Sequence, residues 1–484
     1  MQQQAHITNH STSNRRLLLP GTIRQSEIIG ALSTALDLTE GQPVGHAAKS
    51  CLIGMKIARQ IGLPENELRY LYFALLLKDL GCSSNASKMC YLFGADDRQV
   101  KRDVKTVDWT KAKENFKFAL KCAAPSASPV QKAMQMFVLA KAGNSGARQL
   151  IKTRCERGAE IARQLNFPDE TASAIASLDE HWNGKGHPQG LKGDEIPIAS
   201  RIMGLAQTLE VFNAACGTVR AIEVAKQRSG TWFDPELVKS LTGIEHDLEY
   251  WRNLDNKSCF AELTSCEPQD TVQTVGENEI DNIALAFAKV VDAKSPWTYR
   301  HSEGVAKIAV GISEAMGLSP EMVRDIERAA LLHDIGKLGV SNMILDKPGR
   351  PTDEEFDEIR KHPDYSKQIL DRVSIFRDLS NVAAAHHERP DGKGYHRQIP
   401  GQELALESRI LAVADVCEAL TAKRPYRDAL PREKVVKIMS AELGKGLCPE
   451  CFEGLQAWWS RNEIDSRVSD QLEAVEKLQA ELSN

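Results

Sequence analysis

The chain has 484 residues, of which 42% are hydrophobic and 26% charged, and its net charge is -5, as in an ordinary soluble enzyme or regulator. This charge gives no basic bias, so we expect no nucleic acid polymer as a partner. The apolar runs are too short for a membrane span, the polar start lacks a signal-peptide core, and eleven scattered cysteines favour reduced thiols. We therefore expect a cytoplasmic protein of two or three domains without a membrane partner.

Helical periodicity dominates the chain after a polar N-terminal tail. In residues 301–316, for example, Val305, Ile308, Ala309 and Ile312 lie at positions i, i+3, i+4 and i+7. Alternating apolar and polar residues, which are typical of strands, are scarce. The sequence therefore predicts an all-α fold.

An internal repeat organises the helical part. Residues 45–81 align without a gap to residues 300–336, at an offset of 255, and His46 then faces His301. A long repeat of this kind indicates two copies of one structural unit. The simplest architecture is two helical domains in tandem.

A second aligned block shows that the copies differ in length. Residues 196–214 align to residues 404–422 at an offset of 208, so the first copy holds about 47 extra residues between the blocks. The predicted division, in chain order, is a disordered tail (1–20), a first copy (21–251) with inserted helices at about 90–150, a linker (252–278), a second copy (279–462) and a C-terminal helix (463–484).

Histidines and carboxylates gather in the second copy, near the ends of predicted helices. The pairs His333-Asp334 and His386-His387 close the apolar runs RAALLHD and NVAAAHH, where buried polar groups are costly unless they are paired or bind a metal. Mixed imidazole and carboxylate ligation suits iron, manganese, nickel or zinc. The candidate metal ligands are His301, His333, Asp334, His362, His386, His387 and Asp415.

Three segments of the second copy resemble the HD-GYP family of bacterial phosphodiesterases. They are HDIGKLGVSNMILDKPG (333–349), HHERPDGKGYH (386–396) and RILAVADVCEALTAKRPYR (409–427), and the resemblance covers about 285–460. It implies an all-helical HD-type phosphohydrolase that opens cyclic dinucleotide second messengers. Some members in which a degenerate copy precedes an intact one act on 3′3′-cGAMP, so the resemblance leaves both cyclic di-GMP and 3′3′-cGAMP as substrates.

The resemblance also assigns the ligands to two metal positions. His301, His333, Asp334 and Asp415 match the metal site shared by HD proteins, while His362, His386 and His387 match the ligands of a second ion, with Asp334 bridging. Two divalent ions, with iron or manganese first and nickel or zinc as alternatives, can activate a shared water for in-line attack on a phosphodiester. The expected nucleophile is the bridging hydroxide.

Several other residues are candidates for binding the substrate. Lys337 can neutralise a phosphate, or it is a solvated lysine at a helix end. Arg424 and Arg427 resemble the family's phosphate-binding pair, since guanidinium groups suit phosphate, although a surface cluster of charge remains open. Asp391 and Tyr395 belong to the signature loop, where Tyr395 is expected either to contact the ligand or to pack the loop.

The sequence departs from the family pattern at two positions. His396 follows Gly394-Tyr395 at the position where the family has proline. We expect this change to affect the contacts of the loop with a partner more than catalysis. Trp297 occupies the position of a glutamate found in members with three metals. We therefore do not expect a third metal.

The first copy has lost most of the corresponding ligands. In the ungapped alignment, Lys78 faces His333, Cys155 faces His362, Leu178 and Asp179 face His386 and His387, Gln207 faces Asp415, and Cys216 and Val219 face the arginine pair. Only His46 and Asp79 persist. We expect a metal-free scaffold that serves dimerisation, positioning of the active copy or sensing, and a homodimer through this copy or the C-terminal helix remains open.

Two other functions stay open beside a cyclic dinucleotide phosphodiesterase. One is an HD phosphohydrolase acting on other nucleotides, which the long HHExxDGxGY signature disfavours. The other is a cyclic dinucleotide receptor or interaction module without catalysis, which seven intact ligand positions disfavour. The leading hypothesis is therefore a metal-dependent phosphodiesterase.

Overall fold

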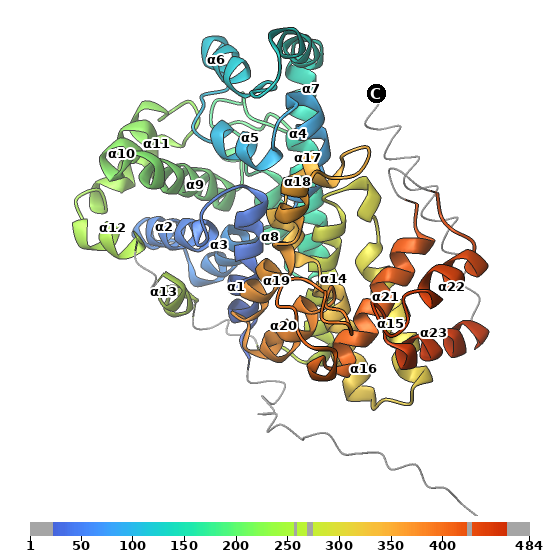
Figure 1. Ribbon diagram of the computed structural model, residues 1–484. Helices are drawn as coiled ribbons and strands as arrows, with labels where there is room; N and C mark the ends of the chain where they lie inside the picture. The colour runs from blue at the N-terminus through green and yellow to red at the C-terminus, as the bar shows by residue number, and fades with distance from the viewer. Residues whose placement is uncertain (1–22, 256–258, 269–273, 424–427, 462–484) are drawn as a thin grey trace, which may run out of the picture.

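The structure is a computed structural model that describes residues 23–255, 259–268, 274–423 and 428–461. Within these ranges it contains helices, turns and a few isolated single-residue bridges, which confirms the all-α fold (Figure 1). None of its helices there combines the length and apolar character needed to cross a bilayer. The predicted N-terminal tail and C-terminal helix lie outside the described residues.

In the described residues, the first copy and the segment after it contain thirteen α-helices. They are α1 (Gln25–Thr39), α2 (His46–Gln60), α3 (Glu65–Leu77), α4 (Ala86–Phe93), α5 (Asp97–Val104), α6 (Ala112–Cys122), α7 (Pro129–Gln164), α8 (Asp169–Ala176), α9 (Ile198–Cys216), α10 (Thr218–Gln227), α11 (Pro235–Ser240), α12 (Leu248–Asp255) and α13 (Cys259–Cys266), with a 3-10 turn η1 (Cys82–Asn85) after α3.

The second copy repeats this order with shorter connections. It contains α14 (Glu277–Asp292), α15 (His301–Ala315), α16 (Pro320–Leu332), α17 (Asn342–Leu345), α18 (Asp353–Ile359), α19 (His362–Leu370), α20 (Arg377–Ala384), α21 (Leu406–Thr421), α22 (Arg432–Ser440) and α23 (Pro449–Arg461), with the 3-10 turns η5 (Pro296–Thr298) and η6 (Ile335–Gly339). The extra length of the first copy corresponds to α5, α6 and the first half of α7.

The two copies pack on each other in a reciprocal way. Helix α1 of the first copy contacts η6 and α19 of the second, while α14, the counterpart of α1, contacts η1 and α7 of the first. An interface in which equivalent surfaces meet is the arrangement found in twofold-symmetric dimers. The tandem repeat thus places within one chain a contact of the kind that joins the subunits of a twofold-symmetric dimer.

A single apolar core runs through both copies. One continuous cluster of buried side chains includes Leu32 and Leu76 of the first copy together with Phe287 and Leu332 of the second. The segment predicted as a linker joins this core, because it contains the end of α12 and helix α13 and buries Leu254 and Leu263. The copies are therefore packed together rather than tethered.

A buried polar group lies where the inserted helix α5 meets the second copy. The carboxylate of Asp97 accepts a hydrogen bond from the backbone N–H of Asn342 (3.0 Å) and lies 3.5 Å from Nζ of Lys294 and 3.4 Å from Nζ of Lys101. Arg98, the next residue on α5, donates to the carbonyl of Gly339 at the end of η6. Helix α5 therefore links the insertion to the turn that carries Lys337.

Candidate metal centre

The structure brings all seven predicted metal ligands together. They come from five helices or helix ends, with His301 opening α15, His333 and Asp334 following α16, His362 opening α19, His386 and His387 following α20, and Asp415 lying within α21 (Figure 1). Their ligand atoms form three overlapping groups, each with atoms within 4.8 Å of one another. Residues up to 114 positions apart in the sequence, His301 and Asp415, thus face one centre.

Local sequence explains how the central pair reaches this place. Ser319 caps α16 by accepting the N–H of Met322 (3.3 Å), and Pro320 occupies the first turn, where its missing N–H costs nothing. The helix then ends as the chain turns into η6, where Gly336 lies against the carbonyl of His362, too close for a Cβ. This contact joins the His333-Asp334 turn to α19.

The two carboxylate oxygens of Asp334 face two different groups of ligands. Oδ2 lies 3.4 Å from Nε2 of His301 and 3.3 Å from Nε2 of His333. Oδ1 lies 3.3 Å from Nε2 of His362 and 3.7 Å from Nε2 of His386. A carboxylate with this placement can bridge two metal ions.

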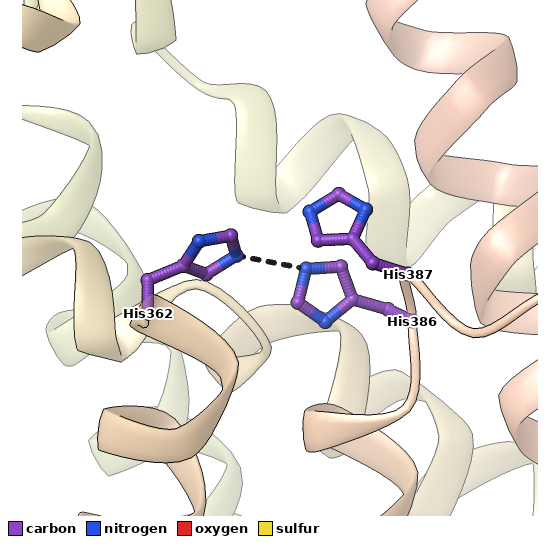
Figure 2. A group of neighbouring side chains, drawn as sticks. All are labelled: His362, His386 and His387. Atoms are coloured by element: carbon purple, nitrogen blue, oxygen red, sulfur yellow. Dashed lines mark hydrogen bonds between the residues drawn. The ribbon is translucent and has the colours of Figure 1, made fainter. Parts of the chain in front are cut away.

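The outer members of the two groups complete the arrangement. Asp415 Oδ1 lies 3.3 Å from Nε2 of His301, on the side of the first group. Figure 2 shows the second group, in which the rings of His362, His386 and His387 face one another and Nε2 of His362 lies 3.1 Å from Nε2 of His386. These three residues are also one of the groups with metal-ligand spacing.

Backbone carbonyls fix the orientation of three imidazoles. Nδ1 of His333 lies 2.7 Å from the carbonyl oxygen of Ala330, and Nδ1 of His362 lies 2.6 Å from that of Ile359. His386 makes the same contact to the residue three positions earlier. A ring that donates from Nδ1 presents the lone pair of Nε2, which is the form that binds a metal.

Burial and charge set the protonation states of the cluster. Burial lowers the pKa of His301, but the carboxylates of Glu418, Asp334 and Asp415 outweigh it and hold that pKa above its usual value, so a metal ion must displace a proton there. Burial, with the neighbouring His387 and His333, holds the pKa of His386 well below its usual value. Burial alone would raise the pKa of Asp334, but the adjacent His333 and Lys337 outweigh it and hold that pKa well below its usual value. Neutral imidazoles and an ionised carboxylate are the ligand forms of these residues.

The polar atoms at the centre fit a pair of cations. Nε2 of His333 and Oδ1 of Asp334 are buried without a hydrogen-bond partner among the described residues. Buried polar atoms are normally satisfied, so two such atoms inside a cluster of nitrogen and oxygen donors indicate a missing ligand. The donor set matches divalent transition metals.

Glu418 is a residue of the site that the sequence argument did not identify. It lies three residues after Asp415 on α21, and its carboxylate contacts Nδ1 of His301. Carboxylates in this place orient a metal-binding histidine and raise its basicity. The signal was present in the repeat, because Glu210 makes the same contact to His46 in the first copy.

The predicted substrate residues fall into different environments. Lys337 forms an ion pair with Asp334, and its side chain is 19% exposed, so it lies at the mouth of the cluster. The ring of Tyr395 packs on His387 at 4.6 Å between centroids, which supports both expectations for this residue. Asp391 pairs with Arg389 and accepts the N–H of Lys393, contacts that stabilise the loop. Arg424 and Arg427 lie outside the described residues.

The loop adopts a backbone conformation that explains the missing proline. His396 has a φ of 129°, a region open mainly to glycine, whereas proline is locked near -65°. The loop is closed instead by Glu388, whose carboxylate accepts the N–H groups of Arg397 (2.7 Å), Gln398 (3.1 Å) and Ile399 (3.1 Å). Glu180 closes the corresponding loop of the first copy in the same manner.

Cations occupy the corresponding place in the first copy. Lys78 forms an ion pair with Asp79, as expected, and Nζ of Lys105 lies 2.9 Å from Glu40 and 3.8 Å from Asp79. Burial lowers the pKa of Lys105, but the carboxylates of Asp79 and Glu40 outweigh this and raise it above its usual value. Lysine ammonium groups thus lie where the second copy presents imidazoles.

One predicted equivalence is wrong. The alignment placed Cys155 opposite His362, but Gly81 approaches the carbonyl of Arg154 as Gly336 approaches that of His362. Arg154 is therefore the counterpart of His362. Arg154 and His362 lie at the offset of 208 that relates residues 196–214 to residues 404–422, so the alignment that paired Cys155 with His362 was displaced by one residue. The guanidinium of Arg154 pairs with Asp179, the counterpart of His387, and adds a further cation to this copy.

Comparisons with known proteins agree with this geometry. The model of the HD domain family matches residues 126–237 and 286–447. The 3′3′-cGAMP-specific phosphodiesterase 3 of Vibrio cholerae is 42% identical over 435 residues, which cover 90% of this chain and 94% of that protein. A cyclic di-GMP phosphodiesterase of Thermotoga maritima is 39% identical over 158 residues, or 32% of this chain and 43% of that protein.

A solved structure extends the similarity to the whole fold. The crystal structure of the cyclic GMP-AMP specific phosphodiesterase V-cGAP3 of V. cholerae superposes with a TM-score of 0.63 at 39% identity, covering 90% of this chain and 98% of that one. The match therefore includes both copies.

Proposed function

The chain belongs to the HD-GYP branch of the HD domain family, and from this premise we propose that it is a metal-dependent phosphodiesterase that opens cyclic dinucleotides to linear dinucleotides. The observation that carries this proposal is the placement of Asp334, whose two oxygens face two separate groups of histidines. In-line displacement at a phosphodiester uses two metal ions held close together, and a bridging carboxylate supplies that geometry.

The second copy supplies the groups that the reaction needs. His301, His333, His362, His386, His387, Asp334 and Asp415 would hold two divalent ions. When bound, such ions lower the pKa of a water and offset the negative charge of the phosphate. Lys337, at the mouth of the cluster, would bind a phosphate oxygen, and Tyr395 would form a wall of the site beside His387. We keep Arg424 and Arg427 as the proposed phosphate-binding pair.

We propose 3′3′-cGAMP as the preferred substrate. The support is the 42% identity, over nearly the full length of both chains, to a protein named as specific for that dinucleotide. Cyclic di-GMP is the second candidate. Relatives named as cyclic di-GMP phosphodiesterases also match this chain, but over a shorter part of it. Iron or manganese is the proposed metal, with nickel or zinc as alternatives.

The first copy has a supporting role in this proposal. Its buried cations favour a scaffold that does not bind metal, and its continuous core with the second copy favours a role in positioning the active site. All eleven cysteines are free thiols, which supports a cytoplasmic location. A homodimer through the first copy or the C-terminal helix remains a prediction.

The decisive experiment is hydrolysis by the full-length protein. Protein loaded separately with iron or manganese is incubated with 3′3′-cGAMP and with cyclic di-GMP, and linear products are separated by chromatography. Faster opening of 3′3′-cGAMP supports both parts of the proposal, and faster opening of cyclic di-GMP reverses the preference. Hydrolysis of mononucleotides alone would establish the general phosphohydrolase, and binding of the cyclic dinucleotide without product would establish the receptor.

A further inference from the structure

A cavity of about 560 Å³ lies inside the first copy, between the inserted helices and the place where the metals have been lost. Its volume falls within the range of small-molecule binding sites. The inserted helices α5, α6 and α7 form one wall, and residues around the lost metal position, such as Glu40, Arg154 and Gln207, form the other. The cavity is separate from the catalytic cluster of the second copy.

One wall, formed by α4, the inserted helices and α7, is apolar. Met89, Leu92, Val100, Phe118 and Leu150 line the cavity and form a second hydrophobic cluster, distinct from the main core. A small separate core beside an open volume leaves apolar surface that an apolar ligand can cover. This part of the cavity therefore suits a hydrocarbon or aromatic body.

Cations outnumber carboxylates among the charged residues of the lining, where Lys101, Lys105, Arg154 and Lys185 lie with Glu40 and Asp179. Lys101 also pairs with Asp97 (3.4 Å), which lies outside the lining, and Arg154 pairs with Asp179. The ammonium of Lys105 is held by Glu40 (2.9 Å), Asp79 (3.8 Å) and Gln207 (3.5 Å), while Lys185 is exposed at the rim. Cations fixed in this way at one end of an apolar cavity can bind the charged end of an anion.

The aromatic residues of the cavity are already packed against one another. The ring of Trp109 stacks on His187 at 5.0 Å between centroids and packs on Trp232 at 5.5 Å. A nucleotide base binds by stacking on a free aromatic face. Here these rings close one end of the cavity, which favours an amphipathic ligand over a nucleotide.

The helix that covers the cavity is broken beside it. Gly143 lines the cavity and interrupts α7 with a φ of 52° and a ψ of -151°, and a Cβ there would meet open space. The angle between the first half of α7 and the rest of the helix is therefore set at this one residue.

We propose that this cavity binds a small amphipathic anion, with its apolar body against the inserted helices and its acidic group at Lys105, Arg154 and Lys185. The proposal assigns a ligand site to the copy that has lost its metals. It is independent of the reaction in the second copy.

Calorimetric titration of the full-length protein tests the proposal. The probes are decanoate, below the concentration at which it forms micelles, and 8-anilinonaphthalene-1-sulfonate, which distinguish a flexible from a flat apolar body. We expect one molecule of at least one probe to bind per chain. Decanol, which lacks the charge, should bind about tenfold more weakly than decanoate or worse, because charge-assisted hydrogen bonds are lost. Absence of binding by both anions, or equal binding of decanol, overturns the proposal.

Two pairs of variants locate the site. Ala142→Trp fills the cavity from α7 and should abolish binding, whereas Ala140→Trp, on the exposed side of the same helix, should leave it unchanged. Lys185→Gln should weaken binding several-fold, and the exposed Lys152→Gln is its control. Circular dichroism checks that each variant is folded. Wild-type binding by both Ala142→Trp and Lys185→Gln, or displacement of the probe by a cyclic dinucleotide, overturns the proposal.

Discussion

Lys78 forms an ion pair with Asp79, the residue that occupies in the first copy the place of Asp334 in the second. Asp334 instead presents its two oxygens to four imidazole nitrogens at 3.3 to 3.7 Å. The same carboxylate at the same point of the same fold therefore has different surroundings. Asp79 lies between two buried lysines, Lys78 and Lys105. Asp334 pairs with one lysine, Lys337, at the mouth of the cluster, and its other neighbours are imidazoles that are candidate metal ligands.

This difference gives a prediction for Asp334→Asn. Replacement removes the charge that bridges the two groups, so each chain should lose at least one metal ion. The rate should fall by more than about a hundredfold, since loss of groups that merely hold metal ligands already costs about 10- to 100-fold. Metal analysis and the rate of 3′3′-cGAMP hydrolysis measure the two effects. Asp79→Asn is the matched control. It leaves the buried Lys78 and Lys105 short of a carboxylate and so lowers stability, but under conditions where circular dichroism shows it to be folded it should keep both the metal content and the rate. Full activity of Asp334→Asn would refute the bridging role.

Glu418→Gln should weaken metal binding without removing a ligand. The carboxylate of Glu418 contacts Nδ1 of His301, and a neutral amide there makes the imidazole less basic. We expect the affinity for metal to fall about 10- to 100-fold, with activity restored at high metal concentration. Titration of activity with manganese measures this shift. Glu210→Gln, the equivalent change in the first copy, should leave the titration curve where it is, and an unshifted curve for Glu418→Gln would remove the positioning role.

His396 offers a test of the loop. Because its φ is 129°, His396→Pro should destabilise the loop by roughly 1–3 kcal/mol or more, whereas His396→Gly should be tolerated. Since Tyr395 packs on His387, displacement of the loop should also lower the rate. Thermal unfolding and hydrolysis rates of the two variants check this. A stable, active proline variant would mean that the loop readily adopts the family's turn.

Asp97→Asn tests the contact between the insertion and the second copy. The change leaves the buried ammonium groups of Lys101 and Lys294 without their carboxylate, and breaking a buried ion pair costs roughly 3–5 kcal/mol. Urea unfolding, monitored by circular dichroism, measures the loss. The exposed Asp169→Asn is the control, and a variant as stable as the wild type would show that the lysines find other partners.

Asp37 predicts a pH dependence of stability. Burial raises the pKa of this carboxyl from 3.8 to about 7. The native state therefore binds a proton that the unfolded state has released, and the free energy of unfolding should fall as the pH rises from about 4 through about 7. Each pKa unit by which the native and unfolded states differ corresponds to about 1.4 kcal/mol of stability. Urea unfolding at several pH values should show a smaller fall for Asp37→Asn, with Asp194→Asn as the control. Equal slopes in all three proteins would contradict the raised pKa.

The sequence by itself determined the helical class, the repeat and the seven candidate ligands of the second copy. It could do so because the ligands lie at fixed places in local motifs, such as His333-Asp334 at the end of α16 and His386-His387 after α20. Helix ends and turns depend on nearby residues, so a motif of a few residues carries their geometry. The loss of ligands in the first copy was visible for the same reason.

The tertiary structure alone decided how distant segments meet. The sequence did not place Glu418 against His301, Lys105 and Arg154 in the lost metal position, or the cavity between that position and the inserted helices. Nor did it show that the predicted linker and both copies share one core. These relationships depend on side-chain packing between elements that are far apart in the chain. Local periodicity shows which face of a helix is apolar, but not which other helix that face contacts. The tertiary structure also decided the backbone conformation of His396, because Glu388 holds the loop in a conformation that a histidine by itself disfavours.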